Sequence, residues 1–337
     1  MTKDLVSILI ITYNTQKITS ECIDSIFENE KQIDFEIILW DNASTDGSKE
    51  KFSKDRRIKY IYSKQNLGFA KANNRALMHA QGEFILYLNS DTICHSNSLS
   101  NLLHRYKECL SSSRCALAPI LLNDDGTLQK SFFQFPSLIK TLIGALGLHR
   151  FATKIVSKIN PRSNFENIFN AQGHIFDTDY AILACNLIKK EYIELVGFLD
   201  INYFFYHDDC DFGYKLKRKG IQQKIFKGSK ITHLGGKSSS SFDIFRIEHY
   251  YRSILYFFFK YSTPRRYVWF GFLFSIVFIL RTIGSIFRLR FSLSVPSSYV
   301  VQDQALFFTR TVWKSAIYTN ASLIFSVWSI RKTLSKG

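Results

Sequence analysis

The sequence predicts an α/β fold, a doubly wound and mostly parallel sheet with helices on both faces, followed by a helical tail. Two observations predict it. Short, continuous apolar runs rich in β-branched residues alternate with segments whose apolar residues recur at helical spacing. After about residue 243 this alternation stops, and longer apolar runs flanked by arginines follow. The 337 residues, 46% of them hydrophobic and 21% charged, suffice for one large domain or two smaller ones.

The first strand and helix set the pattern. VSILIITY (6–13) is an apolar run typical of a strand buried on both faces, and in QKITSECIDSIFEN (16–29) Ile18, Cys22 and Ile26 recur at helical spacing. Four such units imply a sheet with right-handed crossovers. The elements expected next are a strand at 35–40, a short helix at 44–52, a strand at 57–63, a helix at 68–82 closed by Gly82, and a strand at 83–88.

Polar residues follow each of the four predicted strands. In open α/β sheets ligands bind beyond the carboxyl ends of the strands, so these residues are the ones to inspect. One at a time they are ordinary turn residues, but four groups along one sheet edge predict a ligand site. No GxGxxG or GxxxxGK[ST] motif occurs, which argues against a dinucleotide or P-loop site. The groups are Thr12-Tyr13-Asn14, Asp41-Asn42-Ala43-Ser44, Asn66 and Asn89-Ser90-Asp91.

The net charge of +16 is concentrated in the tail. Residues 244–337 hold thirteen Lys and Arg against two acids, so the rest of the chain is nearly balanced. YVWFGFLFSIVFIL (267–280) and AIYTNASLIFSVWSI (316–330) are apolar and flanked by basic residues. A spanning helix needs about 20 apolar residues. These runs favour helices lying in the headgroup region of an anionic membrane, with a helical cap on the preceding domain as the alternative. No nucleic-acid-binding motif accompanies the charge, and no nucleic acid is expected as a partner.

Two further features indicate an intracellular chain. The apolar run near the N-terminus is too short for a signal peptide, and Asp4 precedes it. The six cysteines show no CxxC or CxxH spacing, which favours reduced thiols over zinc or a disulfide framework. With the tail, this places the expected protein at the cytoplasmic face of the cell membrane, peripheral or monotopic.

An ordered set of motifs resembles a known family. The motifs are VSILIITYN, DNASTDGS (41–48), NLGFAKANN (66–74), LYLNSDT (86–92), HDDCDFGYKLKRKG (207–220) and THLGGKS (232–238). In order and spacing they resemble the inverting GT-A-fold glycosyltransferases of family 2, and most of all the bacterial rhamnosyltransferase-like enzymes. The resemblance divides the chain into a glycosyltransferase domain, residues 1–243, and a tail, residues 244–337.

The resemblance implies a site for a nucleotide-diphosphate sugar donor. Asp41 would contact the nucleotide base, and Thr12, Tyr13 and Asn14 would line the same pocket. Asn66, Gly68 and Asn73 would shape the loop and helix near the donor. Asn89, Ser90 and Asp91 occupy the motif usually written DxD, whose first carboxylate is absent here.

The same resemblance implies a divalent cation, Mg²⁺ or Mn²⁺, on the donor diphosphate. Asp91 would be the metal-binding acid, and His233 a second ligand, with a structural histidine bonded to backbone as the alternative. A histidine ligand would favour Mn²⁺, because imidazole is softer than oxygen. The ion would stabilise the charge of the leaving diphosphate.

The acidic stretch FFYHDDCDF (204–212) opens a predicted helix whose last turn is basic and which Gly220 ends. The carboxylates of Asp208, Asp209 and Asp211 could therefore be only its N-terminal cap and first turn. The resemblance instead implies that Asp209 is the general base for the acceptor hydroxyl, with Asp208 beside it. Neighbouring acids and aromatic residues raise a carboxyl pKa, whereas a helix N-terminus lowers it, and the sequence leaves both outcomes open.

The implied function is transfer of a sugar, with rhamnose as the candidate, onto a saccharide or polyprenyl-diphosphate-linked acceptor in bacterial surface polysaccharide assembly (O-antigen, capsule or cell wall). The alternative is a catalytically degenerate subunit that binds nucleotide sugar or acts as a scaffold at the membrane. Residues 131–168, apolar and basic, are a candidate lid, acceptor loop or second membrane-facing patch. Cys185 has no basic residue beside it in the sequence that could activate it as a nucleophile, and it is expected to be a packing residue.

Overall fold

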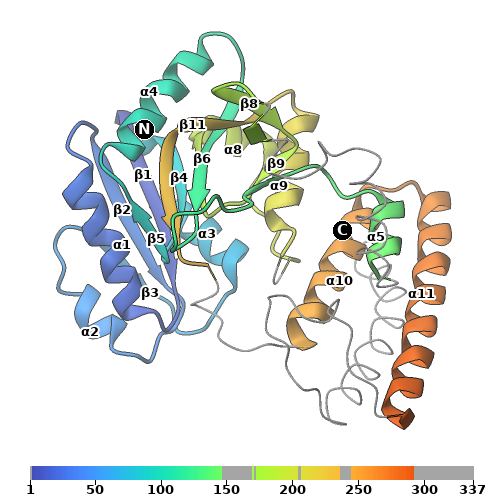
Figure 1. Cartoon of the computed structure of the whole chain (residues 1–337). Helices are drawn as coiled ribbons and strands as arrows, with labels where there is room; N and C mark the ends of the chain where they lie inside the picture. Colours follow the sequence, from blue (N-terminus) through green and yellow to red (C-terminus); the bar gives the residue numbers. More distant parts are fainter. Residues whose placement is uncertain (1, 146–168, 171, 204–205, 236–243, 292–337) are drawn as a thin grey trace. The chain divides into compact units, whose positions relative to one another are not determined.

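The computed structural model describes residues 2–145, 169–170, 172–203, 206–235 and 244–291 (Figure 1). The chain forms two units. The sheet unit comprises residues 1–135, 169–204 and 208–240, and the helical unit comprises residues 136–168, 205–207 and 241–337.

The core of the sheet unit is a nine-stranded mixed sheet. Its strand order is β3-β2-β1-β4-β10-β6-β11-β5, and β8 pairs with β11 beside β5. Six strands run in one direction, because β10 is antiparallel to both β4 and β6 while the other neighbours along that path to β11 are parallel. The strands are β1 (Thr2–Thr12), β2 (Phe35–Asp41), β3 (Lys59–Tyr62), β4 (Gly82–Asn89), β5 (Thr92–Cys94), β6 (Cys115–Leu122), β8 (Ile175–Thr178), β10 (Cys185–Lys189) and β11 (Gln222–His233).

The central strands are buried on both faces, as their continuous apolar runs predict. Ile8 of β1 pairs with Ile37 of β2 and with Leu86 of β4, and all three are fully or almost fully buried. A second, two-stranded sheet joins β7 (Phe132–Phe133) to β9 (Tyr180–Ala181).

Helices cover both faces of the large sheet (Figure 1). On one face, α1 (Gln16–Asn29), α2 (Ser48–Phe52) and α4 (Ser98–Leu110) contribute to one apolar cluster, with Ile26 and Leu102 fully buried. On the other face, α3 (Phe69–Leu77), α8 (Lys190–Val196) and α9 (Asp208–Arg218) contribute to a second cluster. The prediction of a sheet with helices on both faces is confirmed.

Two local predictions about α3 need correction. The helix ends at Leu77, not near residue 82, and Gly82 begins β4. Gly82 is required by close packing of strands: a Cβ there would lie 2.5 Å from the carbonyl oxygen of Leu5. A glycine that looks like a helix terminator is therefore a point of close backbone approach.

A buried carboxylate fixes the start of α4. Glu30, 3% exposed, accepts hydrogen bonds from the backbone N–H groups of Leu99 and Ser100 at 2.7 and 2.9 Å. Its two oxygens also accept the hydroxyls of Ser98 and Ser100 at 3.1 and 2.7 Å. Helix N-termini leave such donors without intrahelical partners, so Glu30 replaces a local cap and ties α4 to the end of α1.

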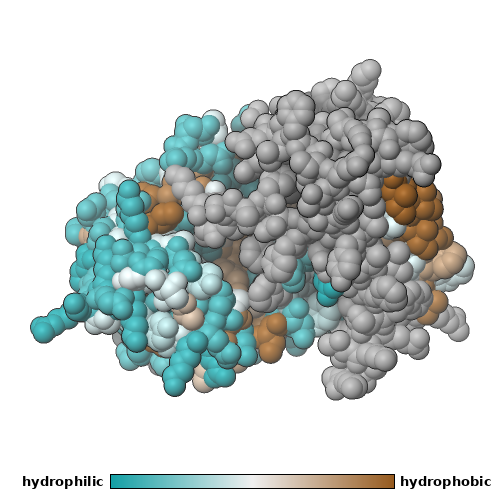
Figure 2. Space-filling model, turned by 90° about the horizontal axis from the view of Figure 1, so that it is seen from below, coloured by the Kyte–Doolittle hydropathy of each residue, from teal (hydrophilic) through white to brown (hydrophobic). Residues whose placement is uncertain are grey.

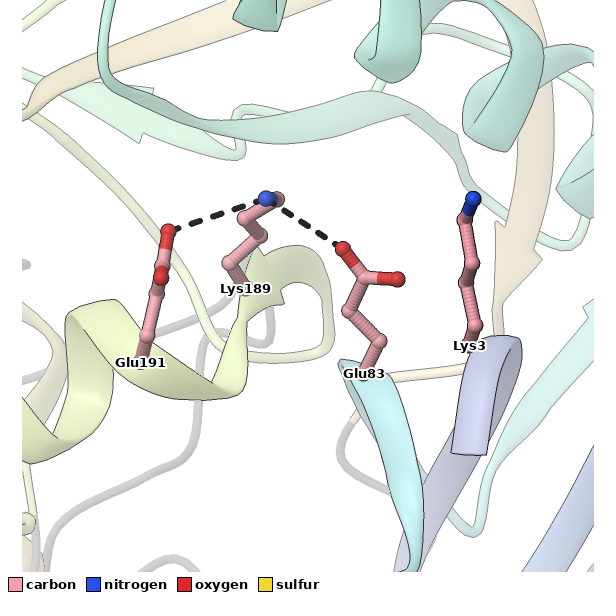
Figure 3. A pocket seen from close by; sticks show the side chains of 4 residues that line it. All are labelled: Lys3, Glu83, Lys189 and Glu191. Atoms are coloured by element: carbon pink, nitrogen blue, oxygen red, sulfur yellow. Dashed lines mark ion pairs between the residues drawn. The ribbon is translucent and has the colours of Figure 1, made fainter. Parts of the chain in front are cut away.

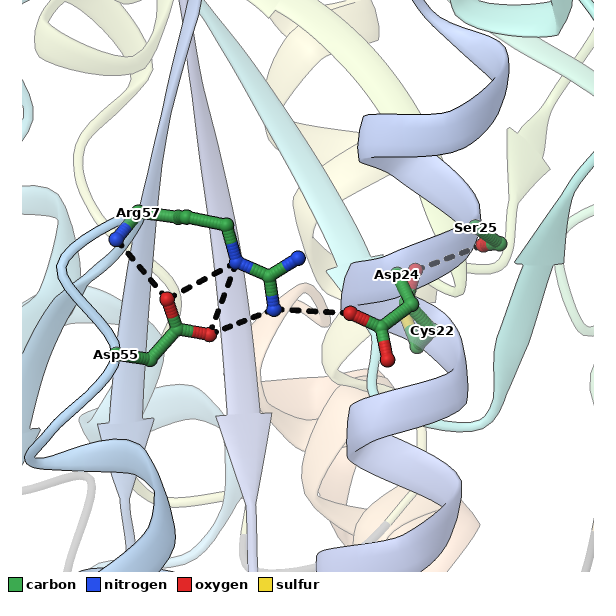
Figure 4. A network of polar contacts seen from close by, with 5 residues as sticks. All are labelled: Cys22, Asp24, Ser25, Asp55 and Arg57. Atoms are coloured by element: carbon green, nitrogen blue, oxygen red, sulfur yellow. Dashed lines mark hydrogen bonds and ion pairs between the residues drawn. The ribbon is translucent and has the colours of Figure 1, made fainter.

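An arginine links α1 to the turn before β3 (Figure 4). Nη2 of Arg57 lies 2.9 Å from Asp24 of α1 and 2.8 Å from Asp55. The guanidinium also lies over the Phe27 ring, 4.9 Å from its centre. All these groups are partly exposed, so we assign this network to local stability.

The described part of the helical unit consists of α5 (Leu138–Ala145), α10 (Ile244–Lys260) and α11 (Pro264–Phe291). Phe274 and Phe278 of α11 are fully buried and form ring contacts with Phe258 and Tyr251 of α10. Arg281 donates to the Ala145 carbonyl at 3.0 Å. Residues 146–168 of the predicted lid and the second apolar run at 316–330 lie outside the described residues.

One side of α11 is apolar and exposed. Figure 2 shows hydrophobic surface in brown on the side of the view where α11 lies in Figure 1. None of the described helices combines the length and the hydropathy that crossing a membrane would require. The exposed large apolar residues of α11 are Val268, Trp269, Phe272, Leu273, Ile276, Ile279, Leu280, Ile283 and Ile286.

Candidate active site

The polar residues named from the sequence gather at one edge of the large sheet. The six strands that share a direction, β1, β2, β3, β4, β6 and β11, have their carboxyl ends at this edge. Helix α9 turns into β11 within three residues and so runs back along it, which directs Asp208 and Asp209 toward the same edge. The topology therefore brings together residues that are far apart in sequence.

Asp41, at the end of β2, is completely buried. Oδ1 accepts the backbone N–H of Ser44 at 2.8 Å, and Oδ2 accepts the Tyr60 hydroxyl at 2.6 Å. Burial and the bond to Asp41 raise the pKa of Tyr60 well above its usual value, so this hydroxyl stays a donor. The carboxylate is held in one orientation, with lone pairs left for a further donor.

Asn14 holds the loop after β2. Its backbone adopts a left-handed conformation, φ 54°, and its N–H donates to Ser44 Oγ at 3.0 Å. Its side-chain oxygen accepts the backbone N–H of Thr45 at 2.7 Å. The neighbouring predicted site residues differ: Tyr13 is exposed, whereas the Thr12 hydroxyl is buried and bonded to the hydroxyls of Thr15 and Thr19. Thr12 thus supports the start of α1.

The turn before α3 is held by Asn42, a residue to which the family resemblance gave no role. Asn42 accepts the Leu67 N–H at 3.1 Å and donates to the Gly68 carbonyl at 3.3 Å. Asn66 accepts the Gly68 N–H at 2.9 Å, and Gly68 has φ 74°, which favours glycine. Asn73 is buried and donates to the Phe69 carbonyl within α3, so its side-chain nitrogen serves the helix.

Asn89, Asp91 and His233 converge from β4, the following turn and the end of β11. His233 Nε2 lies 3.2 Å from Asp91 Oδ1 and 3.2 Å from Asn89 Nδ2. The Asp91 and His233 side chains are only 6% and 13% exposed, and Ser90, between Asn89 and Asp91, is also buried. A nearly enclosed carboxylate beside an imidazole nitrogen can hold a cation.

We tested whether this pair fits a divalent ion. Adjacent ligands of an octahedral ion with bonds near 2.1 Å lie about 3.0 Å apart, close to the observed 3.2 Å. Among the described residues, no group of three or more His, Cys, Asp or Glu side chains could hold a metal ion. Asp91 and His233 therefore suit an ion that takes its remaining ligands from phosphate oxygens and water.

Gln129 completes this cluster, and sequence reasoning missed it. Its Oε1 lies 2.6 Å from His233 Nδ1. The available signal was the Asp125-Gly126 pair, which follows the apolar run of β6 after two polar residues, because an Asp-Gly pair between apolar runs favours a tight reversal. That reversal returns Gln129 beside the end of β6, where its N–H bonds the Leu121 carbonyl at 2.8 Å.

At the start of α9, Asp208 and Asp209 are partly buried. Burial, with the Asp208 charge as a second cause, raises the pKa of Asp209 well above its usual range. Burial also raises the pKa of Asp208. At Asp209, burial outweighs the hydrogen bond that the carboxylate accepts from the Cys210 backbone N–H, which lowers the pKa. Asp211 is buried more deeply and accepts the Tyr203 hydroxyl at 3.3 Å.

Cys185 begins β10 at the same edge, next to Ala184, whose carbonyl accepts the Asn89 N–H at 3.0 Å. The thiol is buried, and burial raises its pKa, so it is a poor nucleophile. The packing interpretation agrees with this environment.

A surface hollow lies away from these residues. Lys3, Glu83, Lys189 and Glu191 line it, at the amino ends of β1 and β4, and Lys189 pairs with both glutamates there (Figure 3). Those strand ends form the edge of the sheet opposite Asp41 and Asp91, so the hollow is separate from the candidate site.

Comparisons with known proteins agree with this geometry. Residues 7–131 match the family described as Glycosyl transferase family 2. The chain is 33% identical over 109 residues to "Glycosyltransferase GlyG" of Streptococcus pneumoniae, covering 31% of this chain and 36% of that protein. It is 37% identical over 98 residues to "UDP-Glc:alpha-D-GlcNAc-diphosphoundecaprenol beta-1,3-glucosyltransferase WfgD" of Escherichia coli, covering 28% of this chain and 38% of that protein. The alignments thus span well under half of these relatives.

The fold is also similar to a solved structure. "Crystal structure of GalNAc-T7 with UDP, GalNAc and Mn2+" superposes with a TM-score of 0.53 at 13% identity, over 75% of this chain and 49% of that one. The comparisons thus relate residues 7–131 to glycosyl transferase family 2, and they show that the fold is similar to that of this solved structure.

Proposed function

We propose that this chain is an inverting, metal-assisted glycosyltransferase that moves a hexose, with rhamnose as the candidate, from a nucleotide diphosphate to a lipid-linked or polysaccharide acceptor. The observation that carries the proposal is the pairing of Asp91 with His233 at the same sheet edge as the oriented carboxylate of Asp41. The names of the relatives support the reaction class, and one of them includes a diphosphoundecaprenol-linked acceptor.

The roles at the donor follow from the side chains. Asp41 would accept a hydrogen bond from the nucleotide base, since Ser44 and Tyr60 fix its oxygens but leave lone pairs. Asp91 and His233 would hold Mn²⁺ or Mg²⁺, with Mn²⁺ favoured by the imidazole. Such an ion, when bound, offsets the negative charge that develops on the diphosphate leaving group.

Asp209 would act as the general base. The acceptor oxygen forms a bond to the sugar C1 while the bond from C1 to the phosphate oxygen breaks, and the hydroxyl proton passes to the Asp209 carboxylate. A raised pKa suits a carboxylate that must take a proton near neutral pH. One in-line displacement inverts the configuration at C1 and requires no covalent enzyme intermediate.

The test is transfer by the purified protein. We expect Mn²⁺-dependent transfer from one of a panel of nucleotide-diphosphate sugars to a lipid-linked acceptor, after a donor screen by thermal shift. Asp209→Asn should keep donor binding and lose turnover. Unchanged turnover in that variant would exclude Asp209 as the base.

A non-catalytic nucleotide-sugar-binding or scaffold subunit is the second candidate. Asn89 favours it, because an amide stands where the usual motif has a carboxylate, and this amide lies against His233. Divalent-dependent transfer or hydrolysis of a nucleotide sugar would exclude this alternative.

We also propose that the protein works at the cytoplasmic membrane face. The support is the exposed apolar side of α11, which carries Trp269 and Phe272, in the region that holds most of the net positive charge. If protein shortened after residue 243 still pellets with anionic vesicles, the tail is not the anchor.

A further inference from the structure

The hydrogen bonds on the Nδ1 side of His233 have a fixed direction from donor to acceptor. The Gln129 amide nitrogen donates to Asn123 Oδ1 at 2.9 Å and to the His233 carbonyl at 3.1 Å. Both partners are acceptors, so the orientation of this amide is determined by its surroundings. Its oxygen must therefore face His233 Nδ1, 2.6 Å away, and can only accept there. Nδ1 consequently carries a hydrogen.

A second set of bonds fixes Asn123 in turn. The Asn123 amide nitrogen donates to Thr127 Oγ1 at 2.9 Å, and the Thr127 hydroxyl donates to Asp125 Oδ1 at 2.6 Å. The two bonds from Thr127 lower the pKa of Asp125, which keeps this carboxylate an acceptor. Each residue in the series His233, Gln129, Asn123 and Thr127 thus donates a hydrogen bond to the next, and Thr127 donates to the Asp125 carboxylate. Reversing the direction of any of these bonds would leave a polar group without its partner.

The turn that carries these groups is itself well determined. The Gly126 N–H bonds the Asn123 carbonyl at 2.9 Å, and the Asn123 N–H bonds the Thr127 carbonyl at 2.8 Å. Gly126 has φ 79°, a conformation that favours glycine, with no atoms within 4 Å of its would-be Cβ. Gln129 is therefore held by backbone as well as by side-chain bonds.

The consequence lies at the other nitrogen of the ring. With the hydrogen on Nδ1, Nε2 lies 3.2 Å from Asp91 Oδ1 and 3.2 Å from Asn89 Nδ2. When the ring is neutral, the Nε2 lone pair and the carboxylate oxygen at that distance repel one another unless a proton or a metal ion lies between them.

We propose that Gln129 is a positioning residue that holds His233 in the Nδ1–H tautomer and thereby keeps Nε2, beside Asp91, available to a divalent cation. The inference rests on the proposed function for the identity of that cation's partner, the donor diphosphate. A hydrogen bond to the remote nitrogen of a ligating histidine orients the ring and increases its basicity.

The first measurement needs no variant of Gln129. Long-range ¹H–¹⁵N correlation spectra of the metal-free full chain at pH 8 report which ring nitrogen carries hydrogen, and His233→Asn assigns the signal. We expect Nδ1–H and a bare Nε2. A ring protonated at Nε2, or at both nitrogens, overturns the inference.

The second measurement is Mn²⁺ affinity, followed by electron paramagnetic resonance of the free ion. Gln129→Leu should weaken Mn²⁺ binding by roughly 10- to 100-fold. Gln129→Glu keeps an acceptor for Nδ1 but loses the two bonds donated to Asn123 and the His233 carbonyl, so it should restore only part of the affinity. Gln222→Leu changes an exposed glutamine at the start of β11, the end of that strand away from His233, and should bind Mn²⁺ as the wild type does. Wild-type affinity in Gln129→Leu overturns the inference.

A failure of the proposed function can be distinguished from a failure of the inference about Gln129. A chain with the Nδ1–H tautomer and Gln129-dependent Mn²⁺ binding, but without transfer from any donor, leaves the inference standing and removes the enzyme assignment. Transfer by a chain with the opposite tautomer does the reverse.

Discussion

His233 Nε2 lies 3.2 Å from Asp91 Oδ1, and the two residues are far apart in the sequence. The parallel arrangement of β4, β6 and β11 produces this pairing, because the ends of these strands share one edge. Where the usual motif has a first carboxylate, the chain has Asn89, and an imidazole from β11 stands beside the remaining acid. The candidate cation site is therefore assembled by the fold.

Asp91→Asn should weaken Mn²⁺ binding and lower kcat by about 100-fold or more, since a neutral amide oxygen is a poorer ligand than a carboxylate. Metal titration and initial rates at saturating donor measure both effects. Asp34→Asn, an exposed acid before β2, is the matched control and should behave as the wild type does. Equal Mn²⁺ affinity in the two variants would contradict the assignment.

The pH dependence of turnover should report the Asp208–Asp209 pair. A base must be ionised, so a raised pKa places the acid limb of kcat above the usual carboxyl range near 3.8, and activity rises with pH through that limb. Asp208→Asn removes the neighbouring charge and should move the limb to lower pH. A limb that stays in place would show that the charge of Asp208 does not act on the base.

The raised pKa of Asp209 also predicts that the stability of the fold falls as pH rises, whereas turnover increases. A carboxyl with a raised folded-state pKa binds its proton more tightly in the folded chain, so its contribution to stability is lost as pH rises through that pKa. Asp209→Asn should therefore melt at a higher temperature than the wild type at pH 9, with a smaller difference at pH 5. Melting curves at the two pH values measure this, and a variant that is less stable at pH 9 would refute it.

Glu30→Ala should destabilise the fold by roughly 3 kcal/mol, because the donors at the start of α4 lose a buried charged acceptor. Urea unfolding followed by circular dichroism gives the free energy. Glu28→Ala, two residues earlier and exposed, should change it by no more than about 0.5 kcal/mol. Similar losses in both variants would refute the capping role.

Tyr60→Phe should raise the donor KM about fivefold and leave kcat unchanged, since it removes one neutral hydrogen bond that orients Asp41. Tyr62→Phe, on the same strand and partly exposed, serves as the comparison. A fall in kcat with unchanged KM would place Asp41 in catalysis and not in donor binding.

Trp269→Glu should reduce binding of the full chain to anionic vesicles, because it puts charge on the exposed apolar side of α11. Met78→Glu alters an equally exposed apolar residue in the sheet unit and should leave vesicle binding intact. Co-sedimentation at two ionic strengths separates apolar from electrostatic attachment. Equal loss in both variants would argue against a specific role for α11.

Local pattern was sufficient for the elements from β1 to β4 and for α9. The helix expected at 16–29 is α1, Gln16–Asn29, and Gly220, with φ 70°, lies just after α9 as expected. The pattern failed at Gly82, where close strand packing, a non-local contact, determines the glycine. It also could not resolve the pKa of Asp209, because burial depends on what packs around α9.

By itself, the sequence predicted the strands and helices up to β4 and the polar strand ends, because these follow from periodicity over short stretches. The candidates Asp41, Asp91, Asp209 and His233 followed from the resemblance in motif order. Only the tertiary structure decided how the candidates are used. It showed that Thr12 supports α1, that Asp41 is oriented by Tyr60, and that Gln129 lies behind His233. Hydrogen-bond partners across a sheet edge depend on strand order and register, which no local pattern encodes.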